Sequence, residues 1–405
     1  MNHPWRGLKE IPHNIWILSF ATLINRSGMM VLPFLTLYMT KEIHVGAGKA
    51  GMVLMFFGIG SLITGPFSGK LSDRFGALRM MKLSLILSGL MLFVYPFISN
   101  FYLILLYTLV WSMVGEAFRP ANLSLISTEV KPEQRKTAFA LNRLAINLGM
   151  SIGPVVGGFL STLNFDLLFY VDGITSILAG IFLIISRFDK HEEQISDTKN
   201  ELETKHEMLR SRSIFRDKVF LLFMISIIPV NMVFFQHIGA LPIYIVRDLG
   251  HKEFVFGLLS AINTVMIIFI EVPLNNAMAH WSDKKSITLG ALLTGIGFGA
   301  MAISGNIFFI MGTIVIWTFG EMIFFPACAS YAAEISPEAK RGEYMGYFQM
   351  TFSSALMLGP WIGTEVLDLF SSTILWSGTF FFGLLSASMI FYLKPKQKMN
   401  LIIKN

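Results

Sequence analysis

The sequence predicts an all-α membrane protein with twelve transmembrane helices in two pseudo-symmetric six-helix bundles. The 405 residues are 54% hydrophobic and only 14% charged, whereas soluble chains carry roughly a quarter charged residues. The apolar residues form twelve stretches, each near the length of about 20 residues that crosses the hydrocarbon core of a bilayer. A charged segment in the middle of the chain separates six stretches from the other six.

The expected helices follow from these apolar stretches, which are joined by short polar connections. Their approximate ranges are 12–39, 49–68, 80–98, 101–128, 137–161, 165–187, 219–246, 254–279, 286–304, 307–333, 342–367 and 372–393. The segment before the first helix lacks the cleavage pattern of a signal peptide, so we expect that helix to be retained.

Three parts of the chain follow from the position of the charged segment. We expect an N-terminal bundle at 1–188, a solvated cytoplasmic linker at 189–218 and a C-terminal bundle at 219–405. Basic residues set the orientation, because cytoplasmic connections are rich in Lys and Arg. With the N-terminus in the cytoplasm, that side holds 25 of the 32 Lys and Arg residues and the outer side holds four. The sequence thus predicts a multi-pass protein of the cytoplasmic (inner) membrane with both termini in the cytoplasm.

The composition also excludes several kinds of site. The single cysteine, Cys328, excludes an intrachain disulfide and a cysteine metal site. The net charge of +6 is spread over short connections rather than gathered in a patch, which argues against a nucleic-acid partner. We expect no metal and no cofactor.

The two predicted bundles repeat each other in sequence, at offsets of 205 to 210 residues. The matching segments are Trp111 to Pro120 with Trp317 to Pro326, Glu129 to Glu133 with Glu334 to Glu338, Gly153-Pro154 with Gly359-Pro360, and Ser72-Asp73-Arg74 with Ser282-Asp283-Lys284. A repeat of half the chain is typical of transporters built from two related halves.

A polar stretch with the pattern G-x-L-x-D-R-x-G, formed by Gly69, Asp73, Arg74 and Gly76, lies between the second and third predicted helices. Its charge alone is equally typical of an ordinary cytoplasmic turn. The ordered pattern resembles the signature between helices 2 and 3 of the major facilitator superfamily of transporters, and the resemblance extends over essentially the whole chain. It implies a gating loop at these four residues. The family places basic residues directly after the second glycine, whereas the first basic residue here is Arg79.

A second signature lies in the fifth predicted helix, at Gly149, Gly153, Pro154, Gly157 and Gly158. It resembles the G-x-x-x-G-P-x-x-G-G pattern of the antiporter branches of this superfamily. Small residues at intervals of four let helices approach closely, and a proline permits a bend. Helix packing alone also explains the glycines. The full pattern favours the twelve-helix drug:proton antiporter branch.

Ionisable residues inside the predicted spans are candidates for proton and substrate coupling, because a charge there is costly. The residues that we expect to carry the coupling are Glu116, Glu321, Arg26, Arg119 and Glu271. Helices 1, 4, 7 and 10 surround the central cavity in this superfamily, so the resemblance implies that Arg26, Glu116 and Glu321 face it.

The structural alternatives are an Arg26–Glu116 pair that only holds helices 1 and 4 together, and an inner-gate role for Glu271. Proton-linked families often carry an arginine four residues before a glycine in helix 4. Trp111 occupies that position relative to Gly115, so Arg119 or Arg26 takes over the role or the coupling differs.

The remaining membrane charges have other expected roles. We expect Arg143 to serve interhelix packing and the gate. Asp172 and Glu365 lie near the outer helix ends, where we expect them to be solvated. Gln236 and His237 in the seventh helix are candidate substrate contacts, although a lone histidine is also compatible with a structural role.

The sequence therefore predicts a secondary active transporter that exports amphipathic small molecules in exchange for protons by alternating access. The alternative is proton-coupled or facilitated uptake of an anionic metabolite or siderophore, which Arg26 and Arg119 favour. A membrane enzyme or a receptor is disfavoured, because the sequence has no paired catalytic motif, phosphate loop or His/Cys metal spacing. The expected partners are a small-molecule substrate, protons and the lipid bilayer, and the expected unit is a monomer.

Overall fold

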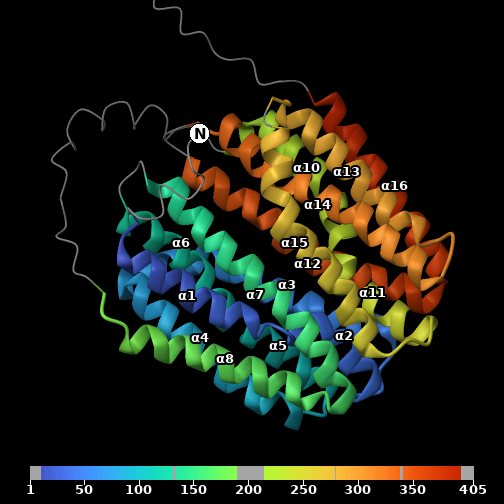
Figure 1. Cartoon of the computed structure of the whole chain (residues 1–405), viewed down its shortest axis with the longest axis horizontal. Helices are drawn as coiled ribbons and strands as arrows, with labels where there is room; N and C mark the ends of the chain where they lie inside the picture. The colour runs from blue at the N-terminus through green and yellow to red at the C-terminus, as the bar shows by residue number, and fades with distance from the viewer. Residues whose placement is uncertain (1–10, 131–133, 189–213, 279, 338–340, 394–405) are drawn as a thin grey trace, which may run out of the picture.

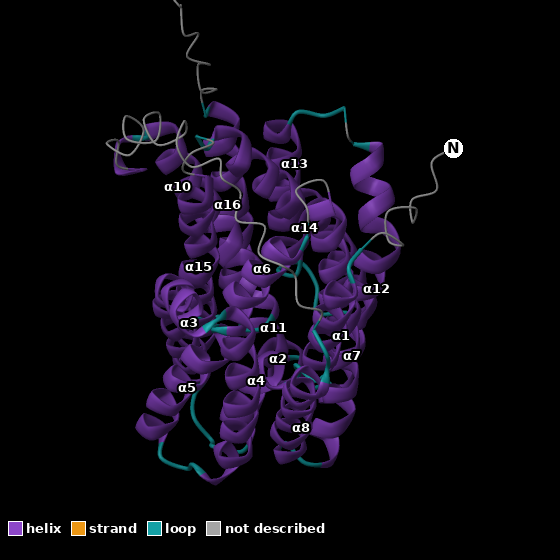
Figure 2. Ribbon diagram, turned by 90° about the vertical axis from the view of Figure 1, so that its left-hand side faces the viewer, coloured by secondary structure: helices purple, strands orange, loops and turns teal. Residues whose placement is uncertain are grey.

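In a computed structural model of the chain, residues 11–130, 134–188, 214–278, 280–337 and 341–393 are described. These residues form helices joined by short loops, without a strand among them (Figure 2). The first part of the chain contains α1 (His13–Ser27), α2 (Val31–Lys41), α3 (Ala47–Phe75), α4 (Ala77–Val94), η2 (Tyr95–Phe97), α5 (Phe101–Glu116), α6 (Phe118–Glu129), α7 (Arg135–Leu163) and α8 (Asp166–Ile185). The second part contains η4 (Ile214–Arg216), α10 (Lys218–Phe234), η5 (Phe235–His237), α11 (Ala240–Ile243), η6 (Tyr244–Asp248), α12 (Glu253–Ala277), α13 (Asp283–Ala300), α14 (Ile307–Ile335), α15 (Arg341–Leu369) and α16 (Ser372–Tyr392).

The all-helical membrane fold class is confirmed. Ten helical segments within the described residues are long and apolar enough to cross a membrane. The other two expected spans, 286–304 and 342–367, are largely helical as α13 and α15 but are not among these ten. Helix α4 shows how such segments meet lipid. Its exposed apolar residues, Leu83, Leu87, Leu90 and Val94, follow the helical period along one face.

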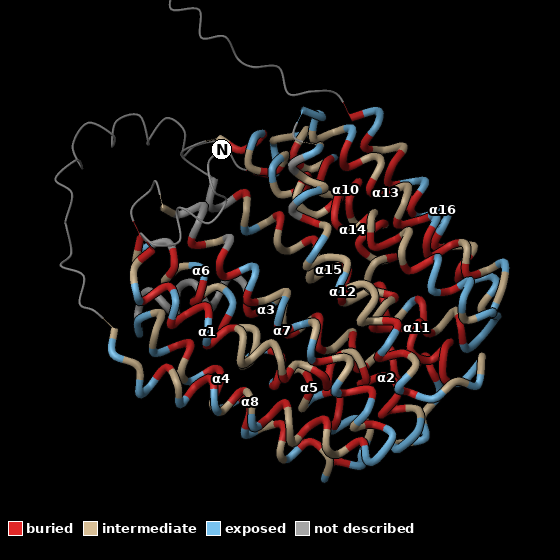
Figure 3. The backbone as a smooth tube through the Cα atoms, in the orientation of Figure 1, coloured by how far each residue is buried: buried red, intermediate tan, exposed pale blue. Residues whose placement is uncertain are grey.

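The helices form two groups that meet along their inner faces, with α1–α8 on one side and α10–α16 on the other (Figure 1). Within the first group α1 packs on α7 and α8, and within the second α13 packs on α14 and α16. Most of the predicted linker, 189–218, lies outside the described residues. Buried positions are concentrated on the inner faces of the helices (Figure 3).

Two antiparallel helix pairs, α3 with α15 and α7 with α12, form the seams between the groups. Both are lined by small residues, which let the backbones approach closely. The contacts along the first seam are Gly51 with Thr364, Gly58 with Met357, and Ser61 with Ser353. In the second seam Gly158 lies against Gly257 near one end, and Arg143 pairs with Glu271 near the other.

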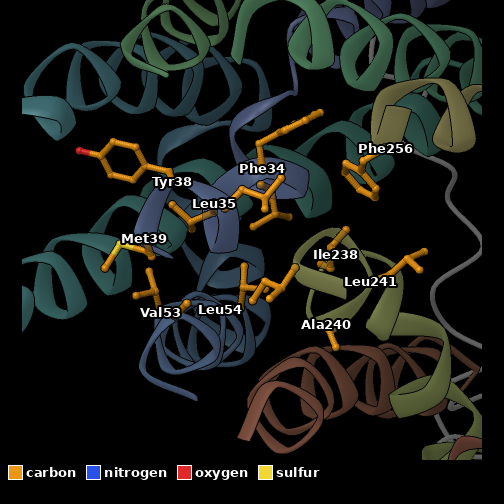
Figure 4. Packing of buried hydrophobic residues seen from close by; sticks show 14 of the residues in the cluster. Phe34, Leu35, Tyr38, Met39, Val53, Leu54, Ile238, Ala240, Leu241 and Phe256 are labelled. Atoms are coloured by element: carbon orange, nitrogen blue, oxygen red, sulfur yellow. The ribbon is translucent and has the colours of Figure 1, made fainter. Parts of the chain in front are cut away.

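A single buried cluster joins the two groups at the predicted outer end of the molecule. Figure 4 shows Phe34, Leu35, Tyr38 and Met39 of α2 beside Ile238, Ala240, Leu241 and Phe256 of the second group. The rings of Phe34 and Phe256 meet edge to face, with centroids 5.2 Å apart. This apolar packing closes the predicted outer end.

The expected loop from Gly69 to Arg79 is wrong in extent, because the backbone of α3 continues as a helix to Phe75. A glycine inside a helix costs only about 1 kcal/mol relative to alanine, so Gly69 does not end it. The chain turns at Gly76, whose φ of 87° suits glycine. The side chains of residues 65–74, and with them the predicted gating contacts of Gly69, Asp73 and Arg74, lie outside the described part of the structure.

Two expected spans are interrupted. The first stops at Ser27 and resumes as α2 at Val31, with Gly28 at the break. The seventh passes from α10 through the 3-10 turn η5 and Gly239 before it continues as α11 and the π-helix η6. Broken helices leave backbone groups free inside a membrane protein, where other protein groups must satisfy them.

Candidate functional site

The helix-5 signature packs against the break in helix 1. Three of its glycines, Gly149, Gly153 and Gly157, recur every fourth residue on α7 and share one face. A Cβ on Gly149 would lie 2.6 Å from the Cβ of Arg26, and one on Gly153 would lie 2.7 Å from the carbonyl oxygen of Met29. Gly157 lies against the start of α2 in the same way. Larger side chains at these positions would displace the break.

The rest of the signature faces the other group of helices. A Cβ on Gly257 of α12 would lie 2.7 Å from the carbonyl oxygen of Pro154, and one on Gly158 would lie 3.1 Å from the Cα of Gly257. The signature therefore connects the break in helix 1 to the seam between the two groups.

A small cavity inside the first group collects three ionisable residues, Arg26 of α1, Glu116 of α5 and Asp172 of α8. Its volume of about 60 Å³ is well below the several hundred Å³ of a drug-sized site. Arg26 and Glu116 thus line one cavity within the first group, and Glu321, which was expected to face the same cavity, is not among its lining residues. Arg26 Nη1 donates to the Met29 sulfur at 2.9 Å, and no partner of the buried Nε is found among the described residues.

The expectation for Asp172 was wrong. Its exposed fraction is 5%, so it is buried rather than solvated. Its Oδ2 accepts the backbone N–H groups of Met30 at 3.3 Å and Val31 at 3.2 Å. Nothing in the sequence indicated this contact, because the two N–H groups lie more than 140 residues away and reach Asp172 only where helix 1 breaks. Arg119 lies elsewhere, exposed in the first turn of α6.

A second charged cluster spans the seam between α7 and α12. Arg143 of α7 forms an ion pair with Glu271 of α12, which is 7% exposed. Glu321 of α14 accepts a hydrogen bond from Asn263 Nδ2 at 2.7 Å. Asn263 and Glu271 both lie on α12, so this helix links the Arg143–Glu271 pair to Glu321. Sequence reasoning missed Asn263, an uncharged residue of α12.

The two candidate substrate contacts in helix 7 lie in different surroundings. Gln236 Nε2 donates to the carbonyl oxygen of Gly359 at 2.7 Å, so this side chain is turned toward α15. His237 packs among aromatic rings, with its ring 4.5 Å from Phe234 and 6.3 Å from Trp317. Its Nδ1 is 2.7 Å from the carbonyl oxygen of Phe234.

Additional contacts hold the predicted outer end. Lys41 of α2 forms an ion pair with Glu253 of α12, and Arg247 Nη1 donates to Asp368 at 3.2 Å. Neither pair was expected from sequence. Within the described residues, no group of three or more His, Cys, Asp or Glu side chains could hold a metal ion.

Two groups of membrane helices, closed at one end and charged along their inner faces, define a secondary-transporter architecture. The family model described as Major Facilitator Superfamily matches residues 15–269 and 232–401. The chain belongs to this superfamily, whose members are multi-pass membrane transporters and not enzymes, so the predicted resemblance is confirmed.

Similar proteins include antiporters and a resistance protein. The chain is 25% identical over 367 residues to the Na(+), Li(+), K(+)/H(+) antiporter of Planococcus maritimus, covering 83% of this chain and 85% of that protein. It is 27% identical over 183 residues to the quinolone resistance protein NorA of Staphylococcus aureus, covering 45% of this chain and 47% of that protein. The crystal structure of a D-xylose–proton symporter has the same fold, with a TM-score of 0.79 at 15% identity over 95% of this chain and 98% of that one. The resemblance to the drug:proton antiporter branch is supported by these relatives.

Proposed function

We propose that the protein is a proton-coupled antiporter that exports amphipathic small molecules across the cytoplasmic membrane by alternating access. In this proposal it works as a monomer, and both termini and the linker lie in the cytoplasm, as the Lys and Arg bias favours. Glu321 carries the proton, and the Arg143–Glu271 pair responds to it across the seam.

The observation that carries the proposal is the setting of Glu321. Its described hydrogen-bond partner is the neutral amide of Asn263, and no ion pair of this carboxylate is found among the described residues. A carboxyl group whose hydrogen-bond partner is a neutral amide can gain and lose a proton without breaking an ion pair of its own. In this proposal the change in the charge of Glu321 alters the Arg143–Glu271 pair, because charges interact more strongly at low dielectric.

The aromatic side chains near Glu321 suit an amphipathic substrate. Phe325 lies one helical turn further along α14 and packs against Phe234 of α10 at 4.9 Å between ring centroids. Trp317, one turn before Glu321, packs with Phe234 as well. Aromatic and apolar walls with a few polar groups are typical of small-molecule sites. The partial similarity to NorA, a quinolone resistance protein, favours the same substrate class.

A second candidate is exchange of monovalent metal cations for protons. It is favoured by the similarity of most of the chain to the Planococcus maritimus Na(+), Li(+), K(+)/H(+) antiporter. Both candidates need a titrating carboxylate, so Glu321 serves either one, and the substrate decides between them.

Proteoliposomes with an acidic interior and an internal pH dye test both candidates. Addition of ethidium, a lipophilic cation, should raise the internal pH in the presence of the wild-type protein. Glu321→Gln should lower the initial rate about a hundredfold, the scale expected for loss of a required proton-transfer group. Glu42→Gln, which changes an exposed carboxylate at the end of α2, is the matched control and should match the wild type.

The outcomes separate the alternatives. A response to NaCl or KCl but not to ethidium would replace drug export by cation exchange. Uptake of an organic anion together with protons would favour the import alternative. Unchanged coupling in Glu321→Gln would remove this residue as the proton carrier.

A further inference from the structure

The carboxyl group of Asp172 lies at the N-terminus of a half-helix inside the membrane. Helix α2 begins at Val31, whose N–H donates to Asp172 Oδ2 at 3.2 Å. The Met30 N–H lies 3.3 Å from the same oxygen and also donates to the Gly28 carbonyl oxygen at 2.7 Å. The first N–H groups of a helix have no intrahelical partner, and the helix dipole favours a negative charge at that end. The carboxylate therefore supplies from α8 the cap that the sequence of helix 1 does not provide.

Two neighbours of Asp172 on α8 hold the other side of the break. Thr175 fills the space beside Gly28, where a Cβ would overlap the Thr175 hydroxyl. Asn25 Nδ2 donates to Ser176 Oγ at 3.1 Å. Thr175 and Ser176 lie three and four positions after Asp172, so each shares a helix face with it. Together the three residues contact helix 1 before, at and after its break.

Helix α2, which this clamp holds, is also the part of helix 1 that closes the predicted outer end. It reaches the second group of helices through a hydrogen bond, an aromatic contact and an ion pair. These contacts are Thr36 Oγ1 to the Gly239 carbonyl oxygen at 3.2 Å, Phe34 to Phe256, and Lys41 to Glu253. A change at the base of α2 is therefore transmitted to the outer closure.

The charged groups that face Asp172 are few. Arg26 of α1 and Glu116 of α5 line the same cavity, to which α2, α3 and α4 contribute only uncharged side chains. Helix α7 brings Gly149 and Gly153 to the break. Among the described residues that line this cavity, the charged groups that can respond to a change at Asp172 are thus Arg26 and Glu116, together with the end of α2.

We propose that Asp172 is a positioning residue for the outer gate, whose charge holds α2 in the closed position against the second group of helices. When the carboxylate takes up a proton, the cap loses its charge, α2 is released and the outer end opens more often. The inference rests on the proposed alternating access but does not depend on which substrate is exported.

Distances between spin labels at the outer end test this proposal on the full chain in lipid nanodiscs. Glu42→Cys and Lys252→Cys place the labels at exposed positions on the two groups, in a background with Cys328→Ser because Cys328 is buried and is the only native cysteine. In the otherwise wild-type protein the short distance should dominate at mildly alkaline pH, and a longer distance should grow on acidification. Asp172→Asn should raise the ratio of long- to short-distance populations about tenfold at alkaline pH, within the range of a partly buried charge at a helix N-terminus, and should remove the pH response.

Asp166→Asn, which removes a carboxylate from the first turn of the same helix, is the control and should behave as wild type. An Asn variant with the wild-type distances at both pH values would overturn the proposal. If that variant does not accumulate, Asp172→Glu decides: it keeps the charge and should stay closed at alkaline pH, and opening there would count against us. The measurement uses no substrate, so a gate that responds in a protein that moves no ethidium would contradict only the export proposal.

Discussion

The two interrupted helices, helix 1 and helix 7, occupy related places in the two groups but are held in different ways. The break in helix 1 is capped by the carboxylate of Asp172 and lies beside Arg26. The turn in helix 7 is held by a neutral amide, because Gln236 donates to the carbonyl oxygen of Gly359. One half therefore carries a contact that a proton can change, and the other carries a contact that it cannot.

The scaffold around the two breaks is nevertheless the same. On α7 a Cβ on Gly153 would lie 2.7 Å from the Met29 carbonyl oxygen, and on α15 a Cβ on Gly359 would lie 2.8 Å from the Met232 carbonyl oxygen. The repeat has thus kept the close backbone contacts while the charges have diverged. Packing geometry and proton chemistry are separable properties of this fold.

The largest expected effect tests the shared scaffold. Gly153→Leu and Gly359→Leu each force a side chain into a backbone, so each should destabilise the protein by about 3 kcal/mol or more, at the upper end of overpacking costs. Thermal unfolding in detergent, followed by intrinsic fluorescence, measures this. Gly312→Leu, where no atom lies within 4 Å of a Cβ, is the control. Tolerance at one glycine and not at the other would break the symmetry that we describe.

The next largest effect tests the difference in charge between the two halves of the chain. Arg143 pairs with Glu271, whereas the residue 206 positions later is the uncharged Gln349. Arg143→Gln should lower the transport rate about tenfold or more, because the partner carboxylate is left buried without its charge partner. Gln349→Ala should have little effect. Exchange of the two charges, Arg143→Glu with Glu271→Arg, should restore part of the rate in the same proteoliposome assay; a double variant as slow as the single one would argue against a direct pair.

The smallest effect concerns helix 7. Gln236→Leu removes one hydrogen bond to the Gly359 carbonyl oxygen, which should cost about 1 kcal/mol of stability. The pH dependence of transport should not change, since no charge is lost. Thermal unfolding together with a transport pH profile measures both, and a shifted profile would show that helix 7 takes part in proton coupling.

The sequence was sufficient for the broad architecture. Apolar length predicted the helices, because length and hydropathy are local properties of the sequence. The glycine signature of helix 5 was also readable, since spacing alone places Gly149, Gly153 and Gly157 on one face.

The failures share a physical cause, which is that they depend on partners distant in the chain. Asp172 was placed by counting along a straight helix, and the break that gives it N–H donors could not be read from helix 1 alone. Glu321 has no charged neighbour on its own helix, and its partner Asn263 comes from α12. Helix α3 continues to Phe75 and the chain turns at Gly76 rather than at Gly69, because a single glycine is too weak a helix breaker.

The two helices of each seam run antiparallel. Residues that follow one another along α3 therefore contact residues in the reverse order along α15, and the same holds for α7 and α12. Each seam is therefore a line of close contact formed by backbone and small side chains. Smooth contacts of this kind would let the two groups rotate relative to each other in the proposed mechanism, while each helix keeps its shape. In the proposed mechanism, the charged contacts of Asp172 with the start of α2 and of Arg143 with Glu271 would oppose this rotation.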